Sequence, residues 1–187
     1  EKYRVEYEQA HYWMAFDSEL EWSARPFQFG GDVELRCLAS PDDTFILPGN
    51  GVLAGIQEFS PNGKQLLFTP EPIAGQRVAL RLYDAKSGDV VWTFDPDTDW
   101  MQAAFHPSGD FVVVAFNQSD AALLDAKTGR EIRRLPNTGP LVYRLAVSPS
   151  GEFAAFGDGQ GGVTVVALEA GQLVTQFRAG ENIIRLL

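Results

Sequence analysis

A turn signature that occurs three times constrains the fold more than any other feature of this sequence. The three copies are Phe59-Ser60-Pro61-Asn62-Gly63, Phe105-His106-Pro107-Ser108-Gly109 and Val147-Ser148-Pro149-Ser150-Gly151, which begin 46 and 42 residues apart. A second turn follows each copy and ends in Gly88, Gly129 or Gly171, at intervals of 41 and 42 residues. Two independent markers with a shared period predict three copies of one supersecondary unit.

Each unit has the pattern of four short strands. The run Phe111–Phe116 is continuously apolar, as in a strand buried on both faces, and no segment has a sustained helical period. The strands that we expect in the first, second and third units are Ile56–Phe59, Gln65–Thr69, Val78–Tyr83, Val90–Phe94; Met101–Phe105, Phe111–Phe116, Ala121–Asp125, Glu131–Leu135; and Val142–Val147, Glu152–Phe156, Val163–Leu168, Leu173–Phe177. The sequence therefore predicts an all-β fold.

A four-stranded unit of this length is typical of a β-propeller blade. Over roughly residues 52–187 the chain resembles the WD40-like (YVTN-like) β-propeller repeat family. The Trp-Asp pair of that family corresponds to Tyr83-Asp84 and Leu124-Asp125 and is absent at Val166-Ala167, while its Gly-His dipeptide has no counterpart. The resemblance implies a propeller of four-stranded antiparallel blades that lacks the family's buried His–Ser–Trp–Asp network.

The expected blades are three clear ones and a partial or irregular one. The clear blades span 52–96, 97–138 and 139–180, and residues 181–187 match the opening strand of a further blade. For residues 1–50 we expect an irregular β segment, a partial or closing blade. Its expected strands are Tyr12–Phe16, Glu19–Trp22, Phe27–Phe29 and Val33–Leu38, the last followed by Ser40-Pro41 as an echo of the turn signature.

Three explanations fit a propeller with so few clear blades, because propellers have about four to eight. Residues 1–50 and the last strand form a closing blade, two copies of the chain pool their blades, or the chain is a fragment of a larger propeller. The sequence leaves all three open.

Charge and composition exclude several classes of partner. The net charge is -10 and the pI about 4.6, so we expect neither nucleic acid nor an anionic membrane as a partner. The longest apolar run, Phe111–Phe116, is far shorter than the roughly 18 residues that a membrane-spanning helix needs. The single cysteine, Cys37, excludes an internal disulfide and indicates a reducing compartment, so we expect a cytoplasmic protein.

Two motifs that suggest ligand binding have simpler explanations. Gly157–Gly162 matches G-x-G-x-x-G, but the β-branched run that follows indicates a strand and not the helix that a dinucleotide site needs, so we expect a hairpin turn. Asp95–Asp99 has D-x-D-x-D spacing, but Trp100 and His106 stand where a calcium loop needs Gly and Glu. We expect a solvated acidic loop there, with a looser cation site as the weaker alternative.

No arrangement of nucleophiles or metal ligands indicates an enzyme. The chain has two histidines and one cysteine, so neither a three-His site nor a Cys–His dyad is expected. His106 occupies the position of Ser60 and Ser148 in the repeat, which favours a structural role. Asp17, Glu19 and Glu21 alternate with other residues and are expected on one outer face of a strand. We expect no catalytic residue, cofactor or metal.

The resemblance implies a non-catalytic scaffold or sensor module that binds proteins. Trp100 and Tyr143 each enter a first strand from an inter-blade loop, and Trp100 lies beside Asp97 and Asp99. Asp97, Asp99, Trp100 and Tyr143 are therefore the candidate partner-binding residues. The expected partner is a protein, or further blades from another copy or chain. The alternative is a propeller part of an enzyme or of a small-molecule or metal binder.

Overall fold

The computed structural model describes residues 14–27, 32–40, 42–48, 54–70, 77–98, 101–116, 120–136 and 142–180. In these ranges the chain forms sixteen strands, arranged as four antiparallel sheets of four strands each. Within every sheet the spatial order of the strands is their order in the chain. None of the described residues belongs to a helix long and apolar enough to cross a bilayer.

The bounds of the strands confirm the repeat over residues 54–178. The first sheet contains β1 (Ala15–Phe16), β2 (Trp22–Phe27), β3 (Asp32–Cys37) and β4 (Thr44–Leu47). The second contains β5 (Ala54–Phe59), β6 (Gln65–Pro70), β7 (Val78–Asp84) and β8 (Val90–Thr98). The third contains β9 (Met101–Phe105), β10 (Phe111–Phe116), β11 (Asp120–Asp125) and β12 (Glu131–Leu135). The fourth contains β13 (Val142–Val147), β14 (Phe153–Asp158), β15 (Gly162–Ala167) and β16 (Gln172–Arg178).

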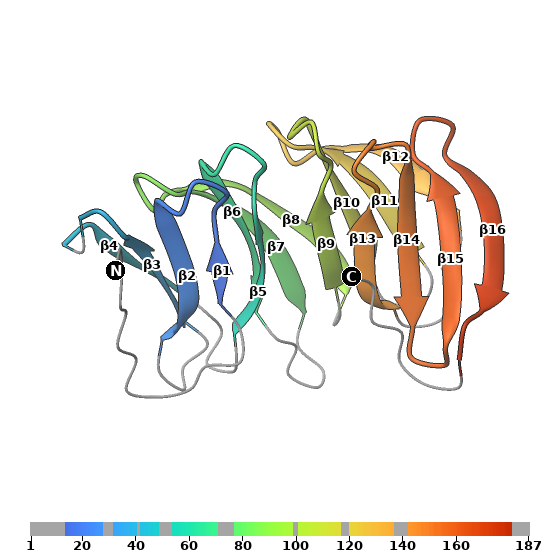
Figure 1. Cartoon of the computed structure of the whole chain (residues 1–187), viewed down its shortest axis with the longest axis horizontal. Coiled ribbons are helices and arrows are strands. Elements are labelled where there is room, and N and C mark those ends of the chain that lie inside the picture. The colour runs from blue at the N-terminus through green and yellow to red at the C-terminus, as the bar shows by residue number, and fades with distance from the viewer. Residues whose placement is uncertain are drawn as a thin grey trace.

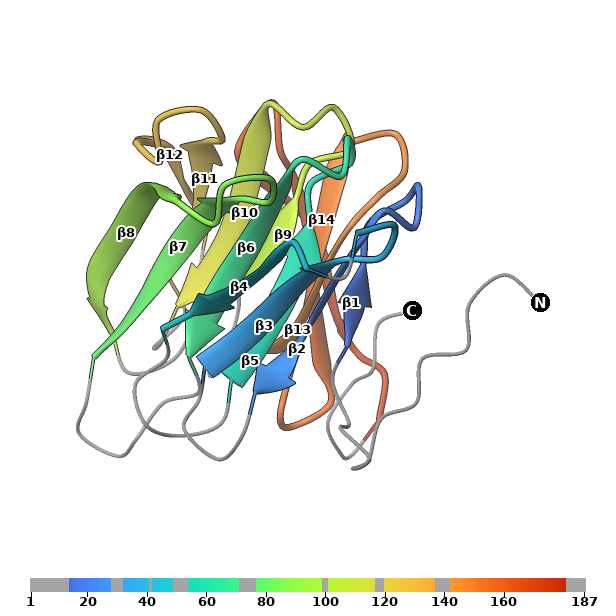
Figure 2. The ribbon, with the colours of Figure 1, turned by 90° about the vertical axis from the view of Figure 1, so that its left-hand side faces the viewer.

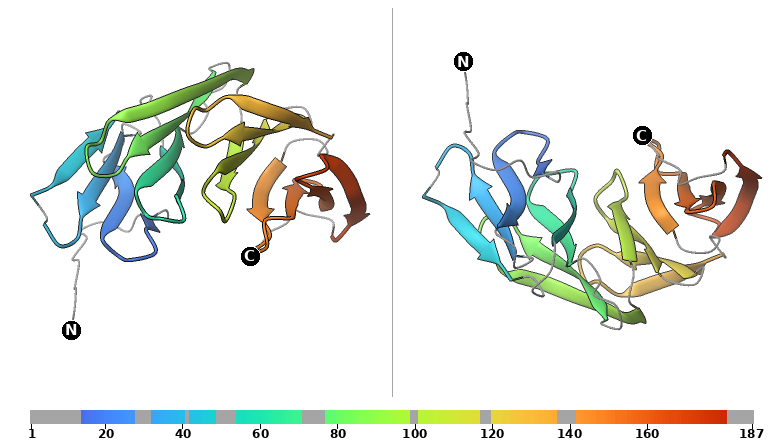
Figure 3. Two further views of the ribbon diagram at one scale, coloured as in Figure 1. Left: turned by 90° about the horizontal axis from the view of Figure 1, so that it is seen from above. Right: turned by 90° about the horizontal axis from the view of Figure 1, so that it is seen from below.

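The four sheets follow one another around an arc, with strands running in the direction of its axis (Figures 1 and 3). The first strands lie on the concave side, where β1 contacts β5, β5 contacts β9 and β9 contacts β13. Seen from the end of the arc, each sheet is stacked in front of the next (Figure 2). The all-β fold of propeller-type blades is therefore confirmed, with each sheet forming one blade.

Apolar side chains fill the space between neighbouring blades, because alternate residues of a strand point to opposite faces of its sheet. Leu35 of the first blade and Phe68 of the second belong to one core, and Leu82 of the second and Val114 of the third belong to the next. Val113, the neighbour of Val114, faces the other way and packs with Phe156 of the fourth blade. This explains why the second strand of the third blade, Phe111–Phe116, is apolar throughout.

A contact between a fourth strand and the next blade repeats along the arc. A Cβ atom added to Gly88 would lie 2.8 Å from Phe45 Cγ, and one added to Gly129 would lie 2.7 Å from Trp92 Cδ2. At Gly171 the corresponding distance to Arg133 Cδ is 2.6 Å. Each of these glycines ends the turn after a third strand. Because glycine has no Cβ, the turn has room for the side chain from the preceding blade. We call this repeated contact the blade latch.

The first blade contains the same turn as the others, although its sequence hides it. Asp17 takes the place of Ser60: its Oδ1 accepts a hydrogen bond from the Trp22 amide at 2.6 Å, as Ser60 Oγ does from the Gln65 amide at 3.0 Å. Leu20 takes the place of Gly63, with a φ of 56° where the glycine has 71°. The backbone hydrogen bond that closes the turn is also conserved between the two blades: Leu20 N to Asp17 O at 3.2 Å and Gly63 N to Ser60 O at 2.8 Å.

Several predictions about the first fifty residues were wrong for this reason. The expected strand Glu19–Trp22 is this turn and the start of β2. Of the expected strand Phe27–Phe29, Phe27 is the last residue of β2, and the other two residues lie outside the described residues. Asp17, Glu19 and Glu21 do not share a strand face, because Asp17 is buried inside the turn. Ser40-Pro41 is not an echo of the first turn, since it follows β3 and leads into β4. Tyr12 and residues 181–187 lie outside the described residues.

We expect the substitution Leu20→Gly to raise the free energy of unfolding by up to about 1 kcal/mol. A positive φ is unfavourable for leucine, and the Leu20 side chain is 59% exposed, so its removal forfeits little packing. Chemical denaturation of both proteins measures the difference. The reverse change in another blade, Gly63→Leu, is the matched control and should destabilise; a loss of stability on Leu20→Gly would contradict the assignment.

Candidate interaction site

The two predicted binding residues that the structure describes, Asp97 and Tyr143, lie at the end of the arc that we call the hairpin face. This face contains the turn 159–161 between β14 and β15, the end of β8 at Thr98 and the start of β13 at Val142, and it is the lower edge in Figure 1. Asp99 and Trp100 lie outside the described residues, so their role stays a prediction.

Asp97 is paired with a basic neighbour. Its Oδ1 lies 2.7 Å from Arg77 Nε, and both side chains are about two-thirds exposed. The Asp97 amide donates a 3.4 Å hydrogen bond to Asp95 Oδ1. Contrary to the expected acidic loop, Asp95 and Asp97 belong to strand β8, and no group of three or more His, Cys, Asp or Glu that could hold a metal occurs among the described residues. The Arg77–Asp97 pair thus presents both charges on the surface.

Tyr143 is supported by the hairpin turn of its own blade. It is the extra residue of a bulge between Val142 and Arg144, and a Cβ added to Gly159 would lie 2.7 Å from its Cε2. The turn beneath the ring is held by Asp158 Oδ1, which accepts hydrogen bonds from the amides of Gln160 (2.8 Å) and Gly162 (2.7 Å). This confirms the hairpin that we predicted for Gly157–Gly162. Tyr143 is half-buried, so a rigid turn presents part of an aromatic ring.

The structure does not bring the two described residues together. Asp97 belongs to the outermost strand of the second blade, and Tyr143 to the innermost strand of the fourth. A partner that contacts both has to cover the hairpin face across the third blade.

His106 has a structural role, as predicted. Its Nε2 lies 3.0 Å from the Gly151 carbonyl oxygen in the next blade, and its Nδ1 accepts a 3.1 Å hydrogen bond from the Ser108 amide. Since a carbonyl oxygen only accepts, Nε2 carries the proton and Nδ1 does not. The imidazole therefore joins the first turns of the third and fourth blades with both nitrogens engaged.

The aspartates at the position of the family's Trp-Asp pair stabilise the turns in which they stand. Asp84 Oδ1 accepts hydrogen bonds from the amides of Lys86 and Ser87, both at 2.9 Å. Asp125 Oδ1 accepts from the hydroxyl and the amide of Thr128, both at 2.7 Å. The hydroxyl bond, followed by the amide bond, lowers the pKa of Asp125 below its ordinary value. In both blades the carboxylate acts locally and not in a buried network.

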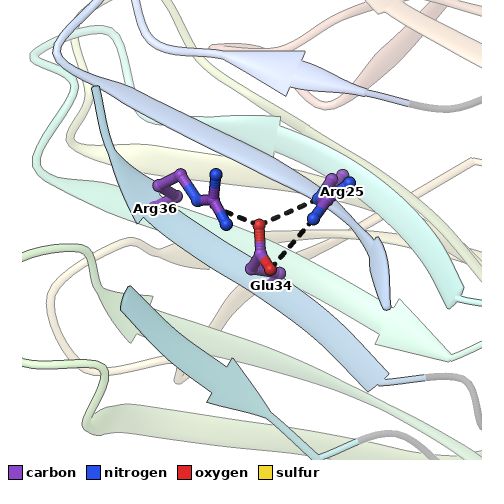
Figure 4. A network of polar contacts seen from close by, with 3 residues as sticks. All are labelled: Arg25, Glu34 and Arg36. Atoms are coloured by element: carbon purple, nitrogen blue, oxygen red, sulfur yellow. Dashed lines mark hydrogen bonds and ion pairs between the residues drawn. The ribbon is translucent and has the colours of Figure 1, made fainter. Parts of the chain in front are cut away.

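A charge network around one buried carboxylate on the first blade was not anticipated from the sequence. Glu34 is 4% exposed and accepts two hydrogen bonds from Arg25, at 2.8 Å from Nε and 3.1 Å from Nη2. Arg36 Nε lies 3.2 Å from the same carboxylate (Figure 4). Arg25 and Glu34 face each other across β2 and β3, and Arg36 follows two residues along β3 on the same face. The sequence shows that Glu34 and Arg36 alternate with apolar residues. The pairing of Glu34 with Arg25 becomes clear only from the register of β2 and β3.

Glu58 is a second carboxylate that the sequence did not single out. It lies on β5, and its Oε1 accepts a hydrogen bond from the amide of Phe105 on β9, so it links the innermost strands of two blades. Burial raises the pKa of Glu58, and the Phe105 amide opposes that rise. Because β9 pairs only with β10 inside its sheet, this carboxylate satisfies a donor on the free edge of β9.

We expect Glu58→Gln to remove a pH dependence of stability just above the ordinary glutamate pKa of 4.5. A raised pKa in the folded state means that the folded chain binds more protons there than the unfolded chain. The contribution of Glu58 is thus fully present below the unfolded pKa and is lost as the pH rises through the folded pKa. Glutamine keeps the acceptor for Phe105 without a charge. Denaturation midpoints between pH 4 and 7 test this, and an unchanged slope in the variant would refute it.

Comparison with known proteins identifies the fold and nothing finer. No protein-family model and no curated protein sequence matches the chain. Among solved structures, the β-propeller domain of Cps50 (Swd1) from Myceliophteria thermophila is similar, with a TM-score of 0.72 and 14% sequence identity over 91% of this chain. The chain spans 57% of that domain. The four described blades therefore have the β-propeller fold that the WD40-like repeats implied.

Proposed function

We propose that this chain is a non-catalytic propeller module that binds a protein partner through its hairpin face. The observation that carries the proposal is Tyr143, a partly exposed aromatic ring seated on the hydrogen-bonded turn 159–161. Aromatic anchors on rigid supports contribute most of the binding energy in many interfaces. The Arg77–Asp97 pair on the same face adds exposed charge of both signs, as expected at the rim of such an interface.

The rigidity of the blades supports a binding role. Three blade latches and three apolar cores connect the four blades, so we expect the blades to keep their relative positions when a partner binds. A preorganised surface loses less conformational entropy on association than a mobile one.

The remaining chemistry favours a protein partner over other ligands. Both ring nitrogens of His106 are engaged in turn contacts, so this histidine is not poised as a general base. The net charge of -10 disfavours nucleic acids and anionic membranes. A single cysteine, which is not disulfide-bonded, is in keeping with the cytoplasm as the place where the module acts.

We expect Trp100→Ala and Tyr143→Ala to reduce recovery of a bound partner about tenfold or more, since truncation of a central aromatic hot spot costs an interface about 2 kcal/mol or more. The measurement is affinity capture with the full chain from its source cells, with bound proteins quantified by mass spectrometry. Lys127→Ala, in an exposed turn at the opposite end of the third blade, is the matched control.

Thermal unfolding of each variant separates binding from folding. Trp100→Ala should leave the midpoint unchanged; if it unfolds the domain, Trp100 is a core residue and not an anchor. Equal recovery from the Trp100, Tyr143 and Lys127 variants would contradict the assignment of the hairpin face.

A further inference from the structure

The fourth blade presents a sheet face with the same construction as the three faces that pack between blades. In each earlier blade, a third-strand leucine and the fourth-strand residue opposite it face the next blade, and the latter forms the blade latch. These pairs are Leu35 with Phe45, Leu82 with Trp92, and Leu123 with Arg133. The corresponding pair in the fourth blade is Val165 with Thr175, and a bulge follows it as it follows the pairs of the second and third blades.

The residues around Val165 and Thr175 make this face apolar. Ala154, Phe156 and Val166 point toward the third blade, so their neighbours point the other way. The outward residues include Ala155 opposite Val165, and Val163 opposite Phe177. Phe177 is 51% exposed, whereas its equivalents Leu47 and Leu135 in the first and third blades are buried. Phe153 is 38% exposed, and Val163 beside Phe177 is buried. We call this surface, made of Phe153, Ala155, Val163, Val165, Thr175 and Phe177, the outward face.

The other end of the arc does not supply a matching surface. Faces that receive a preceding blade are apolar in the second, third and fourth blades, where they carry Phe68, Val114 and Phe156. The same face of the first blade carries Arg25, Glu34 and Arg36. Packing that network against the outward face would desolvate two arginines that share one carboxylate, which is costly.

We propose that the outward face docks a further four-stranded blade that is not the first blade of this chain. Its receiving side is apolar, like those of the second to fourth blades, and the turn after its third strand has a glycine that accepts Thr175. Two observations identify the occupant as a blade: the outward face continues the interfaces already present, and the chain spans 57% of the similar propeller domain. The inference concerns a sheet face and stands independently of binding at the hairpin face.

A photo-crosslinker at Thr175 tests the proposal. The full chain carrying Thr175→p-benzoylphenylalanine is irradiated in its source cells, and the crosslinked peptide is mapped by mass spectrometry. We expect the crosslink in the turn after the third strand of a four-stranded repeat outside residues 14–180, on the same or another polypeptide. Arg133→p-benzoylphenylalanine is the positive control, because Arg133 contacts the turn at Gly171 within this chain.

A second substitution tests the apolar character of the contact. Phe177→Lys should reduce the Thr175 crosslink tenfold or more, whereas Ile132→Lys, at an exposed position of the third blade's outer strand, should not. A crosslink to residues 37–43 of the first blade would show that this chain closes on itself or on a second copy and would overturn the proposal. A crosslink to a segment without the repeat, or no crosslink while the Arg133 control reacts, would also overturn it.

Discussion

Replacing Trp92 by alanine is expected to lower the free energy of unfolding by about 4 kcal/mol, the cost typical of removing a buried tryptophan. The side chain is 7% exposed and belongs to the core between the second and third blades. Its Nε1 donates a 2.8 Å hydrogen bond to the Ala126 carbonyl oxygen, and its ring fills the space above Gly129. The substitution therefore removes packing, an inter-blade hydrogen bond and a blade latch together. Urea denaturation, followed by far-UV circular dichroism, measures the loss.

Two related variants divide this loss into its parts. Trp92→Phe keeps most of the buried ring but leaves the Ala126 carbonyl without its indole donor, so we expect about 1–2 kcal/mol. Arg133→Ala removes the equivalent latch at Gly171, but Arg133 is exposed and its loss should cost less than that of Trp92. If Trp92→Ala costs no more than Arg133→Ala, the latch at Gly129 does not hold the blades together as we describe.

The strands of the last three blades were predictable because their signals are local. A Pro-x-Gly turn needs only neighbouring residues, and alternation or continuity of apolar residues marks the strands on either side. The expected bounds of Met101–Phe105, Phe111–Phe116 and Glu131–Leu135 agree with the structure. β8 is longer than expected, because Thr98 pairs with Val78 after a register shift that contains Asp97 with its positive φ.

The first blade was not predicted as a regular blade, because its first turn has the same backbone hydrogen bonds as the others but lacks the Pro-x-Gly residues. Asp17 supplies the acceptor that serine supplies elsewhere, and Leu20 adopts the conformation for which glycine is favoured. Neither residue type marks the turn in the sequence. Ser40-Pro41 carried the expected letters but follows a third strand instead of a first. Dissimilar residues can thus form the same turn hydrogen bonds, and a search for the Pro-x-Gly residues finds only the turns that contain them.

For the candidate site, the sequence predicted the position of a residue within its own strand but not its contacts with other elements. The position of Tyr143 at the start of a blade follows from the repeat, but its contact with Gly159 depends on a bulge in β13. The links between elements were missed for the same reason. Glu58 meets Phe105, and Trp92 meets Ala126, only after neighbouring blades have packed. Sequence periodicity reveals which residues are buried, and the register and packing of the blades decide what they touch.

We expect Glu34→Ala to cost about 2 kcal/mol, less than for a fully buried pair, because Arg25 and Arg36 lose their carboxylate but are 18% and 32% exposed and keep part of their hydration. Glu34 accepts from Arg25 at 2.8 and 3.1 Å and lies 3.2 Å from Arg36 Nε. The variant would leave two like charges side by side on one face of the sheet. Glu34→Gln keeps one acceptor without the charge, so its loss should be smaller. Urea denaturation at low and high salt measures both, and added salt should reduce the deficit of the alanine variant by screening the arginines.

Replacing all three residues at once separates the cost of breaking the network from its net contribution. The triple variant Arg25→Met, Glu34→Leu and Arg36→Met gives the first blade the apolar receiving face that the other blades have. We expect its stability to exceed that of Glu34→Ala, since replacing all three residues together leaves no charge without its partner. The triple variant should also self-associate, because its first blade now matches the outward face of the fourth. Light scattering measures this. If the triple variant stays monomeric, the charge network is not what prevents the first blade of one copy from docking on the outward face of another.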